Sequence, residues 1–263
     1  MAKIIDKLWN WGHLAGSHNQ LLSLDCSMSP EQFGKKYGIN KSFMVSYGGN
    51  IQPPYDELAK SMSALDEIKW SVLGDASTPL PDTELGNTED VIAAAKVAKN
   101  ITGAVVDDFF SPERLERFTP EVLSKMKNRL AENGLDFWCV LYEHNLDTVD
   151  LKAYLPCFDG VTFWLWKAEQ IEKIEQYVQE LKSMIGNKPL MLGIYLWDYG
   201  NVAPMNTALF EKQLSYSFKL IENGEIEGAV ICSNTIGDAD LETNKILKQY
   251  IKKYGRREVL SKI

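Results

Sequence analysis

Positive charge is scarce in this chain. Its 263 residues include 28 Lys and Arg against 36 Asp and Glu, which gives a formal net charge of -8. Proteins that bind nucleic acids or anionic membranes draw affinity from Lys and Arg side chains that neutralise phosphates, so this balance argues against both kinds of partner. We therefore expect a small-molecule or oligosaccharide substrate, no nucleic-acid partner and no membrane partner. The sequence gives no prediction of the oligomeric state.

Long apolar runs are also missing. The longest, such as Met191 to Trp197, fall far short of the roughly 20 residues that a helix needs to cross a bilayer. The N-terminal segment from Met1 to Asp6 lacks the long apolar stretch of a signal peptide. These absences predict a cytoplasmic protein.

Cysteine and histidine are few, and neither forms a metal-binding pattern. There is no CxxC pair among the cysteines, and the three histidines form no HxH or HxxxH pair. The scattered spacing favours reduced core thiols over a disulfide framework or a metal site. The four cysteines are Cys26, Cys139, Cys157 and Cys232. We accordingly expect no metal and no cofactor.

Eight short apolar runs alternate with longer amphipathic segments along the chain. Such runs are typical of buried parallel strands, and the amphipathic segments are typical of the helices that cover them. The expected strands are Lys7 to Trp11, Phe43 to Tyr47, Ile68 to Leu73, Ile101 to Val106, Asp136 to Tyr142, Gly160 to Trp166, Leu190 to Trp197 and Glu227 to Ser233. Helices are expected from Pro30, over 54–66, from Asn87 or Thr88 to Lys99, from Pro120, and over 168–185, 205–223 and 241–254.

Several helix boundaries carry their own signals. Ser29 can act as an N-cap, with Pro30 at the first helical position and Gln32 completing a capping box. Thr119 followed by Pro120 repeats the cap and the proline. Glycines that should end helices are Gly134, Gly186 and Gly224.

Eight strand-then-helix units in about 260 residues match the size of a closed eight-stranded parallel barrel. An open doubly wound sheet is the alternative, but no GxGxxG follows the first expected strand and no GxxxxGK[ST] occurs in the sequence. The sequence therefore predicts an α/β fold, a single (β/α)8 (TIM) barrel, with one domain over residues 1–263.

Polar and aromatic residues gather where the expected strands end. Barrel enzymes carry their chemistry on the loops that follow the strands, so these positions predict a site. The composition is that expected of a site that stacks sugar rings on flat apolar faces and contacts hydroxyl groups with polar side chains. The expected substrate-binding residues are Trp11, His13, Tyr47, Asn50, Asp75, His144, Trp164, Trp166, Trp197, Tyr199, Asn201 and Asn234.

Two adjacent carboxylates, Asp107 and Asp108, end the fourth apolar run. Neighbouring residues on a strand point to opposite faces, so both can enter the barrel mouth only if the strand has ended before them. An acid flanked by Phe109 and Phe110 is expected to have a raised pKa, as a general acid near neutral pH requires. The purely structural alternative is that both carboxylates cap the turn into the next element.

An apolar strand followed by Asp-Asp and an apolar residue resembles the fourth-strand tip of barrel glycoside hydrolases that use participation by an N-acetyl group of the substrate, the N-acetylhexosaminidase type. The resemblance covers about ten residues around Asp107 and Asp108. It implies that Asp107 orients and polarises the acetamido group while Asp108 protonates the leaving oxygen.

Ordinary two-carboxylate chemistry would need a partner from another strand. Glu143 follows the fifth expected strand and Asp198 follows the seventh. A separation of about 5 to 5.5 Å between the carboxyl groups implies retention, and roughly 6.5 to 9.5 Å implies inversion. The structural alternatives are a salt bridge from Glu143 to Lys167 and a hydrogen bond from loop backbone to Asp198.

The residues thus predict a glycoside hydrolase-like enzyme with Asp108 as general acid and Asp107, Glu143 or Asp198 as the assisting carboxylate. One alternative is a divalent-metal sugar isomerase or epimerase in which Asp108, Glu143, His144 and Asp198 bind the cation. Another is a barrel that binds a saccharide without catalysis. The sequence leaves these alternatives open.

Overall fold

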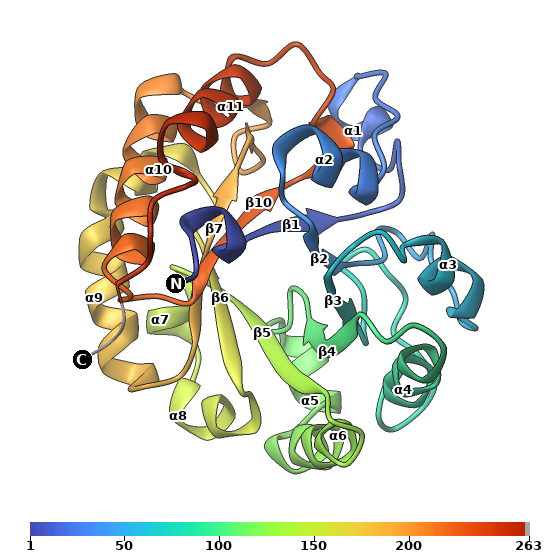
Figure 1. The fold of residues 1–263 in the computed structure, drawn as a ribbon. Coiled ribbons are helices and arrows are strands. Elements are labelled where there is room, and N and C mark those ends of the chain that lie inside the picture. The colour runs from blue at the N-terminus through green and yellow to red at the C-terminus, as the bar shows by residue number, and fades with distance from the viewer. Residues whose placement is uncertain (261–263) are drawn as a thin grey trace.

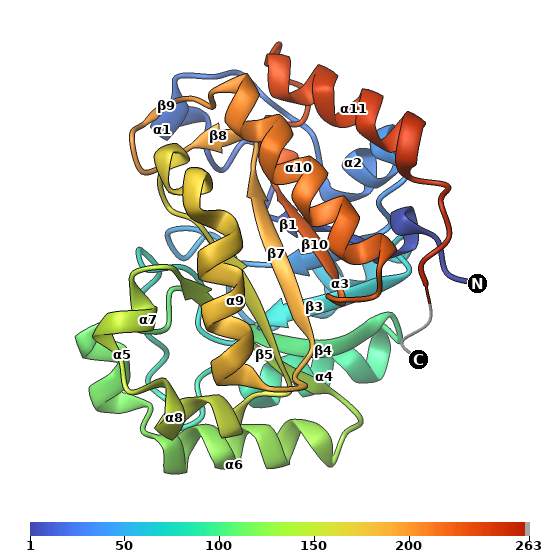
Figure 2. The ribbon, with the colours of Figure 1, turned by 90° about the vertical axis from the view of Figure 1, so that its left-hand side faces the viewer.

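The computed structural model describes residues 1–260; residues 261–263 of the expected domain lie outside the described residues. Eight parallel strands close into a barrel in the order β1-β10-β7-β6-β5-β4-β3-β2. Helices lie outside this barrel (Figure 1), and α9 and α10 cover the outer side of β7 (Figure 2). The predicted (β/α)8 barrel is confirmed.

The strands are short and begin close to the predicted positions. The barrel strands are β1 (Leu8–Gly12), β2 (Lys41–Met44), β3 (Glu67–Ser71), β4 (Ile101–Val106), β5 (Asp136–Tyr142), β6 (Gly160–Trp164), β7 (Leu190–Tyr195) and β10 (Gly228–Cys232). A small antiparallel hairpin between β7 and β10 consists of β8 (Trp197–Asp198) and β9 (Ala203–Pro204).

The helices follow the strands, and several loops contain an additional short helix. The α-helices are α1 (Asn19–Leu22), α2 (Pro30–Tyr37), α3 (Asp56–Ser61), α4 (Thr88–Val97), α5 (Pro112–Arg117), α6 (Pro120–Ala131), α7 (Asn145–Thr148), α8 (Leu151–Tyr154), α9 (Ile174–Ile185), α10 (Thr207–Glu222) and α11 (Glu242–Tyr254). The 3-10 helices are η1 (Ile4–Lys7), η2 (Leu155–Cys157), η3 (Ala168–Lys173) and η4 (Asn234–Ile236). No helix within residues 1–260 is long and apolar enough to cross a membrane.

The helix-boundary signals act as predicted at α2. Ser29 Oγ accepts a hydrogen bond from the backbone of Gln32 at 3.3 Å, and the Gln32 side chain accepts one from the backbone of Ser29 at 2.8 Å. The three predicted helix-ending glycines all adopt positive φ, a conformation that costs glycine little. Asn87 precedes α4, but its side chain donates to Tyr55 Oη and does not cap the helix.

Several strands end earlier than predicted. β2 ends at Met44, where the prediction extended to Tyr47, and β6 ends at Trp164, where it extended to Trp166. Beyond these ends Val45 and Leu165 are buried, whereas Tyr47 and Trp166 line the mouth of the barrel, and together they continue the sequence pattern of a buried strand.

The barrel interior is filled with aromatic side chains and one ion pair. Phe43 of β2 contacts Trp138 of β5, two strands that are not neighbours, so this contact passes through the interior. Near the amino ends of the strands, buried Lys69 Nζ lies 2.7 Å from both carboxylate oxygens of Asp136 and over the rings of Trp9 and Trp138. This packed layer closes the barrel from below, so a ligand can enter the barrel only from the carboxyl ends of the strands.

Candidate functional site

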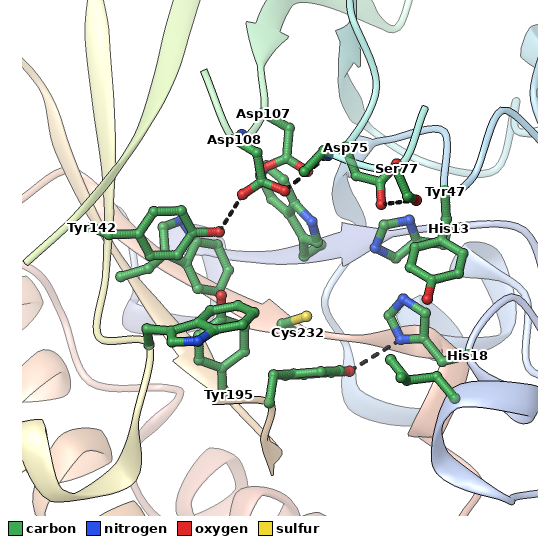
Figure 3. A pocket seen from close by; sticks show the side chains of 16 residues that line it. His13, His18, Tyr47, Asp75, Ser77, Asp107, Asp108, Tyr142, Tyr195 and Cys232 are labelled. Carbon is green, nitrogen blue, oxygen red and sulfur yellow. Dashed lines mark hydrogen bonds between the residues drawn. The ribbon is translucent and has the colours of Figure 1, made fainter. Parts of the chain in front are cut away.

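A cavity of about 330 Å³ opens at the carboxyl ends of the barrel strands. Figure 3 shows its side chains, with Asp108 and Tyr142 at one end and His18 and Tyr47 at the other. Most of the lining is aromatic or carboxylate. The lining residues are Trp11, His13, His18, Leu21, Tyr47, Asp75, Ala76, Ser77, Asp107, Asp108, Tyr142, Trp164, Trp166, Tyr195, Tyr199 and Cys232. We call this space the first cavity.

Asp107 and Asp108 both line the first cavity. They can do so because β4 ends at Val106, and Asp108 then adopts a left-handed backbone with φ of 45°. Alternation of side chains between two faces applies only while a strand continues. This left-handed residue is what brings two consecutive carboxyl groups to one space, at a conformation that non-glycine residues adopt at a cost.

Asp107 is buried, and its Oδ1 accepts a hydrogen bond from the backbone N–H of Asp108 at 2.9 Å. Burial raises the pKa of Asp107 well above its usual value, and the charges of Asp108 and Asp75 raise it further, while the Arg114 guanidinium opposes these effects. The Asp107 carboxyl group therefore retains a proton at pH values where an isolated aspartate has lost it.

The carboxylate of Asp108 is held from two sides. Its Oδ1 accepts a hydrogen bond from Tyr142 Oη at 2.7 Å, and its Oδ2 accepts one from the backbone N–H of Ala76 at 3.0 Å. Burial and the nearby Asp108 charge raise the pKa of Tyr142 well above its usual value, so the phenol stays a hydrogen-bond donor. The side chain of Asp108 is thus fixed in direction at the end of the first cavity.

Arg114 of α5 joins the loops that follow β3 and β4. Its buried guanidinium donates to the carbonyl oxygens of Gly74 at 3.1 Å, of Asp75 at 2.5 Å and of Asp107. Charge-assisted hydrogen bonds of this kind are stronger than neutral ones. The Arg114 side chain therefore positions the backbone of two carboxylate residues while remaining outside the cavity lining.

Aromatic rings form the floor and one side of the first cavity. Trp11 of β1 and Trp164 of β6 meet edge to face with ring centroids 5.2 Å apart, and Trp164 also packs against Tyr195 at 4.9 Å. Gly193 makes room for this floor, because a Cβ atom at that position would lie 1.9 Å from the Trp164 ring. Broad apolar faces beside carboxylates suit the faces of a sugar ring.

Two histidines close the other end. The rings of His13 and His18 lie 4.7 Å apart, and His13 Nδ1 lies 3.0 Å from the carbonyl oxygen of Val45, so it carries the hydrogen. Burial lowers the pKa of His13 to about 4; burial, and then the charge of His13, lower that of His18 to about 3. Both rings are therefore neutral near pH 7 and can exchange hydrogen bonds with hydroxyl groups.

Asp75 is the third carboxylate of the lining, but its oxygens already accept hydrogen bonds from protein groups. It accepts hydrogen bonds from the Gly48 backbone at 3.1 Å, from Ser77 Oγ at 2.7 Å and from Thr78 Oγ1 at 2.6 Å. Within the described part of the chain, no Lys or Arg lines the first cavity. The lining charge is accordingly negative or neutral.

Glu143 and Asp198, the other two predicted catalytic carboxylates, lie outside the lining of the first cavity. Glu143 accepts hydrogen bonds from Gln170 Nε2 at 2.5 Å and from the backbone of Trp166 at 3.0 Å. Burial would raise the pKa of Glu143, but hydrogen bonds from His144 and Trp166 hold it below its usual value. Both contacts identify Glu143 as a support for the Trp166 loop, and the salt bridge to Lys167 is not formed.

Asp198 forms hydrogen bonds with loop backbone, as its structural alternative predicts. It accepts hydrogen bonds from the backbone of Asn201 at 3.1 Å and of Ala168 at 3.3 Å.

Five predicted substrate-binding residues also lie outside the first-cavity lining, namely Asn50, His144, Trp197, Asn201 and Asn234. Asn234, for example, is buried and joins the backbones of His13 and Met28. Seven of the twelve do line the cavity: Trp11, His13, Tyr47, Asp75, Trp164, Trp166 and Tyr199.

The four side chains of the divalent-metal alternative are not gathered around one point. Asp108 faces Tyr142 and Ala76, whereas Asp198 faces Ala168 and Asn201. Across residues 1–260, no group of three or more His, Cys, Asp or Glu side chains is arranged to hold a metal ion.

Several lining residues were not predicted: His18, Leu21, Ala76, Ser77, Tyr142, Tyr195 and Cys232. Tyr142 and Tyr195 are the last residues of β5 and β7, so the rule that strand ends carry the site would have found both. No sequence signal places His18 or Leu21 at the mouth. All four cysteines are free and buried, as predicted, but Cys232 also reaches the cavity.

Comparison with models of known protein families and with curated proteins gives no match to this chain. Solved structures are similar in fold. The spore cortex-lytic enzyme SleL of Bacillus megaterium matches with a TM-score of 0.61 and 12% identity over 98% of this chain and 75% of that chain. A chitinase from Chromobacterium violaceum matches with a TM-score of 0.57 and 9% identity over 93% and 98%. A chain of the tryptophan synthase complex from Pyrococcus furiosus matches with a TM-score of 0.54 and 13% identity over 97% and 99%. At these identities the likeness establishes the barrel fold alone.

Proposed function

We propose that this protein is a glycoside hydrolase-like enzyme that acts on a carbohydrate, with Asp108 as general acid and Asp107 as the assisting carboxylate. The observation that carries the proposal is that two consecutive carboxyl groups face one cavity whose floor and side are aromatic. Two of the structural neighbours are a spore cortex-lytic enzyme, SleL, and a chitinase, and both names are consistent with a carbohydrate substrate.

The pair supplies the proton that glycosidic cleavage needs. Because the pKa of Asp107 is raised by burial and by Asp108, Asp107 holds a proton where a solvated aspartate would be ionised, and in the proposed reaction this proton passes to Asp108. Asp108 delivers it to the leaving oxygen, since its carboxyl group stands at the end of the cavity and is oriented by Tyr142. As the C–O bond breaks, the leaving group departs as an alcohol.

For the nucleophile we propose an N-acetyl group of the substrate. Asp107 accepts the acetamido N–H, and the acetamido carbonyl oxygen attacks the anomeric carbon as the leaving group departs, which gives a cyclic oxazolinium ion. Water opens that ion while the pair takes up the water proton. The arrangement supports this route because Glu143, which follows β5, and Asp198, in β8, point into loop contacts and not into the first cavity.

The charge of the lining narrows the substrate class. With Asp75, Asp107 and Asp108 in the lining and no Lys or Arg among the described lining residues, a phosphate group would meet like charge without a compensating cation. A neutral sugar meets no such repulsion. The proposal is therefore a neutral N-acetylhexosamine glycoside.

The test compares 4-nitrophenyl N-acetylhexosaminides with the matching hexosides, in both anomeric forms. We expect release of nitrophenol from an N-acetylhexosaminide only, with a kcat/KM that falls with each fluorine added to the acetyl group, because fluorine weakens the carbonyl nucleophile. Asp108→Asn should lower kcat by a factor of about 10²–10⁴ on a natural glycoside whose leaving group needs the proton.

Asp66→Asn is the matched control, because Asp66 is exposed immediately before β3, at the opposite end of the barrel. It should keep wild-type kcat. Equal turnover of fluorinated and unfluorinated substrates would contradict substrate assistance. Saccharide binding without any turnover by the wild type would instead identify a non-catalytic saccharide-binding barrel.

A further inference from the structure

A second cavity, of about 410 Å³, adjoins the first. The two share Ala76, Asp108, Tyr142 and Trp166. The second cavity adds Phe110 and His144, which belong to the loops after β4 and β5 and do not line the first. A ligand that occupied both spaces would therefore pass beside the carboxyl group of Asp108.

The boundary between the cavities is a hydrogen-bonded pair. Tyr142 Oη donates to Asp108 Oδ1 at 2.7 Å, and both side chains line both cavities. Figure 3 shows this pair at the end of the first cavity, away from the two histidines. A bond that joins a ring in the first cavity to a group in the second consequently lies within reach of the proposed general acid.

The second cavity offers flat faces. His144 stacks on Tyr142 with ring centroids 5.3 Å apart and planes 6° apart, and its side chain is 55% exposed. Trp166 stands edge-on to Tyr142 at 5.7 Å and is 39% exposed, so part of its ring is open to a ligand. Glu143 fixes the Trp166 backbone at 3.0 Å, so this face is held in place.

The charge of the second cavity is low. Asp108 is its one carboxylate, and no Lys or Arg lines it within residues 1–260. Flat faces without a cation suit a neutral ring and give an anionic group such as a phosphate no counter-charge. These features distinguish a sugar leaving group from a nucleotide or phosphate leaving group.

From these contacts we infer that the second cavity is the leaving-group subsite and that the substrate is at least a disaccharide, whose second, neutral ring packs against Trp166 and the Tyr142–His144 stack. This inference rests on the proposed function. It adds that the enzyme acts within or at the end of an oligosaccharide and that part of its affinity comes from the ring that departs.

The test measures binding of N-acetylglucosamine and N,N'-diacetylchitobiose to Asp108→Asn by isothermal titration calorimetry, since this variant should bind the disaccharide without cleaving it. We expect the disaccharide to bind about tenfold more tightly. Adding His144→Ala or Phe110→Ala should weaken disaccharide binding by about fivefold, the scale of one lost aromatic contact, and leave monosaccharide binding within about twofold. His144 is exposed, so its removal should not impair folding.

Leu21→Ala is the reciprocal control, because Leu21 is exposed and lines the first cavity but not the second. It should weaken both sugars equally. Equal affinity for the two sugars, unchanged by His144→Ala, would overturn the leaving-group subsite while the proposed function stood. If neither sugar bound and the wild type cleaved no glycoside, the proposed function would fall and this inference with it.

Discussion

The pH dependence of stability should change when Asp107 is replaced by asparagine. In the unfolded chain an aspartate loses its proton near pH 3.9, whereas burial and the charge of Asp108 raise the pKa of Asp107 well above its usual value in the folded protein. Between these two pKa values the folded state binds the extra proton, so the free energy of unfolding falls as pH rises. The amide side chain of the Asp107→Asn variant has no such proton to lose, and its oxygen can still accept from the Asp108 backbone.

The size of this effect on the free energy of unfolding follows from the one extra proton that the folded state binds. The stability of Asp107→Asn relative to wild type should increase from about pH 4 upward by as much as ~1.4 kcal/mol per pH unit, and level off above the folded pKa. For a chain of this size that slope corresponds to about 2–3 °C in Tm per pH unit. Thermal or urea unfolding of both proteins from pH 4 to pH 8 measures the difference directly.

Two further variants sharpen this measurement. Asp108→Asn removes the second-largest cause of the raised pKa of Asp107, so the window in which stability falls should end at a lower pH than in the wild type. Asp66→Asn removes an exposed charge far from the pair and serves as the control. A stability difference between wild type and Asp107→Asn that stays constant from pH 4 to pH 8 would refute the burial argument.

Three other substitutions test separate parts of the structure. Tyr142→Phe removes one hydrogen bond to Asp108 and should lower kcat/KM by about 10–100-fold, as expected for a bond to a charged group; steady-state kinetics at a temperature where both proteins are fully folded would show it. Gly193→Ala places a methyl group where the Trp164 ring lies, so we expect a loss of about 1–3 kcal/mol in urea unfolding together with weaker sugar binding. Lys69→Met breaks the ion pair with Asp136 and should cost about 2 kcal/mol, less than the roughly 3–5 kcal/mol of a fully buried pair because the Asp136 side chain is 40% exposed. Sugar affinity should not change, because this pair lies at the other end of the barrel; equal loss of affinity would contradict that placement.

The barrel could be predicted from sequence because its signal is repeated. Eight apolar runs separated by helix signals fix the number and order of units, and capping residues such as Ser29 act locally, within four residues of one another. The carboxyl ends of the strands were less predictable. Beyond Met44 and Trp164 the chain continues with residues that are buried or line the first cavity, and strand pairing, which depends on the neighbouring strand, is not visible in the sequence of one segment.

Site residues that directly follow a strand were predictable from the sequence, whereas residues that reach the site from a longer loop were not. Asp107 and Asp108 immediately follow β4, so their place at the mouth follows from the fold. His18, by contrast, reaches the cavity from the loop after β1 through contacts with Tyr199 and Thr235, which lie more than 180 positions away in the chain. Glu143 has the same position after a strand as Asp107, but its neighbours Gln170 and Trp166 turn its carboxylate away from the first cavity, and the strand pattern does not encode that turn.

The packed layer beneath Trp11 and Trp164 has a consequence for the order of events in a catalytic cycle. Phe43, Trp138 and the Lys69 side chain fill the barrel there, so a molecule bound on this floor has no passage through the interior. Under the proposed function, substrate would arrive and both products would depart through the same opening. The fragment nearer the opening would then leave first, and the fragment on the tryptophan floor would leave last and act as a competitive inhibitor of the next substrate.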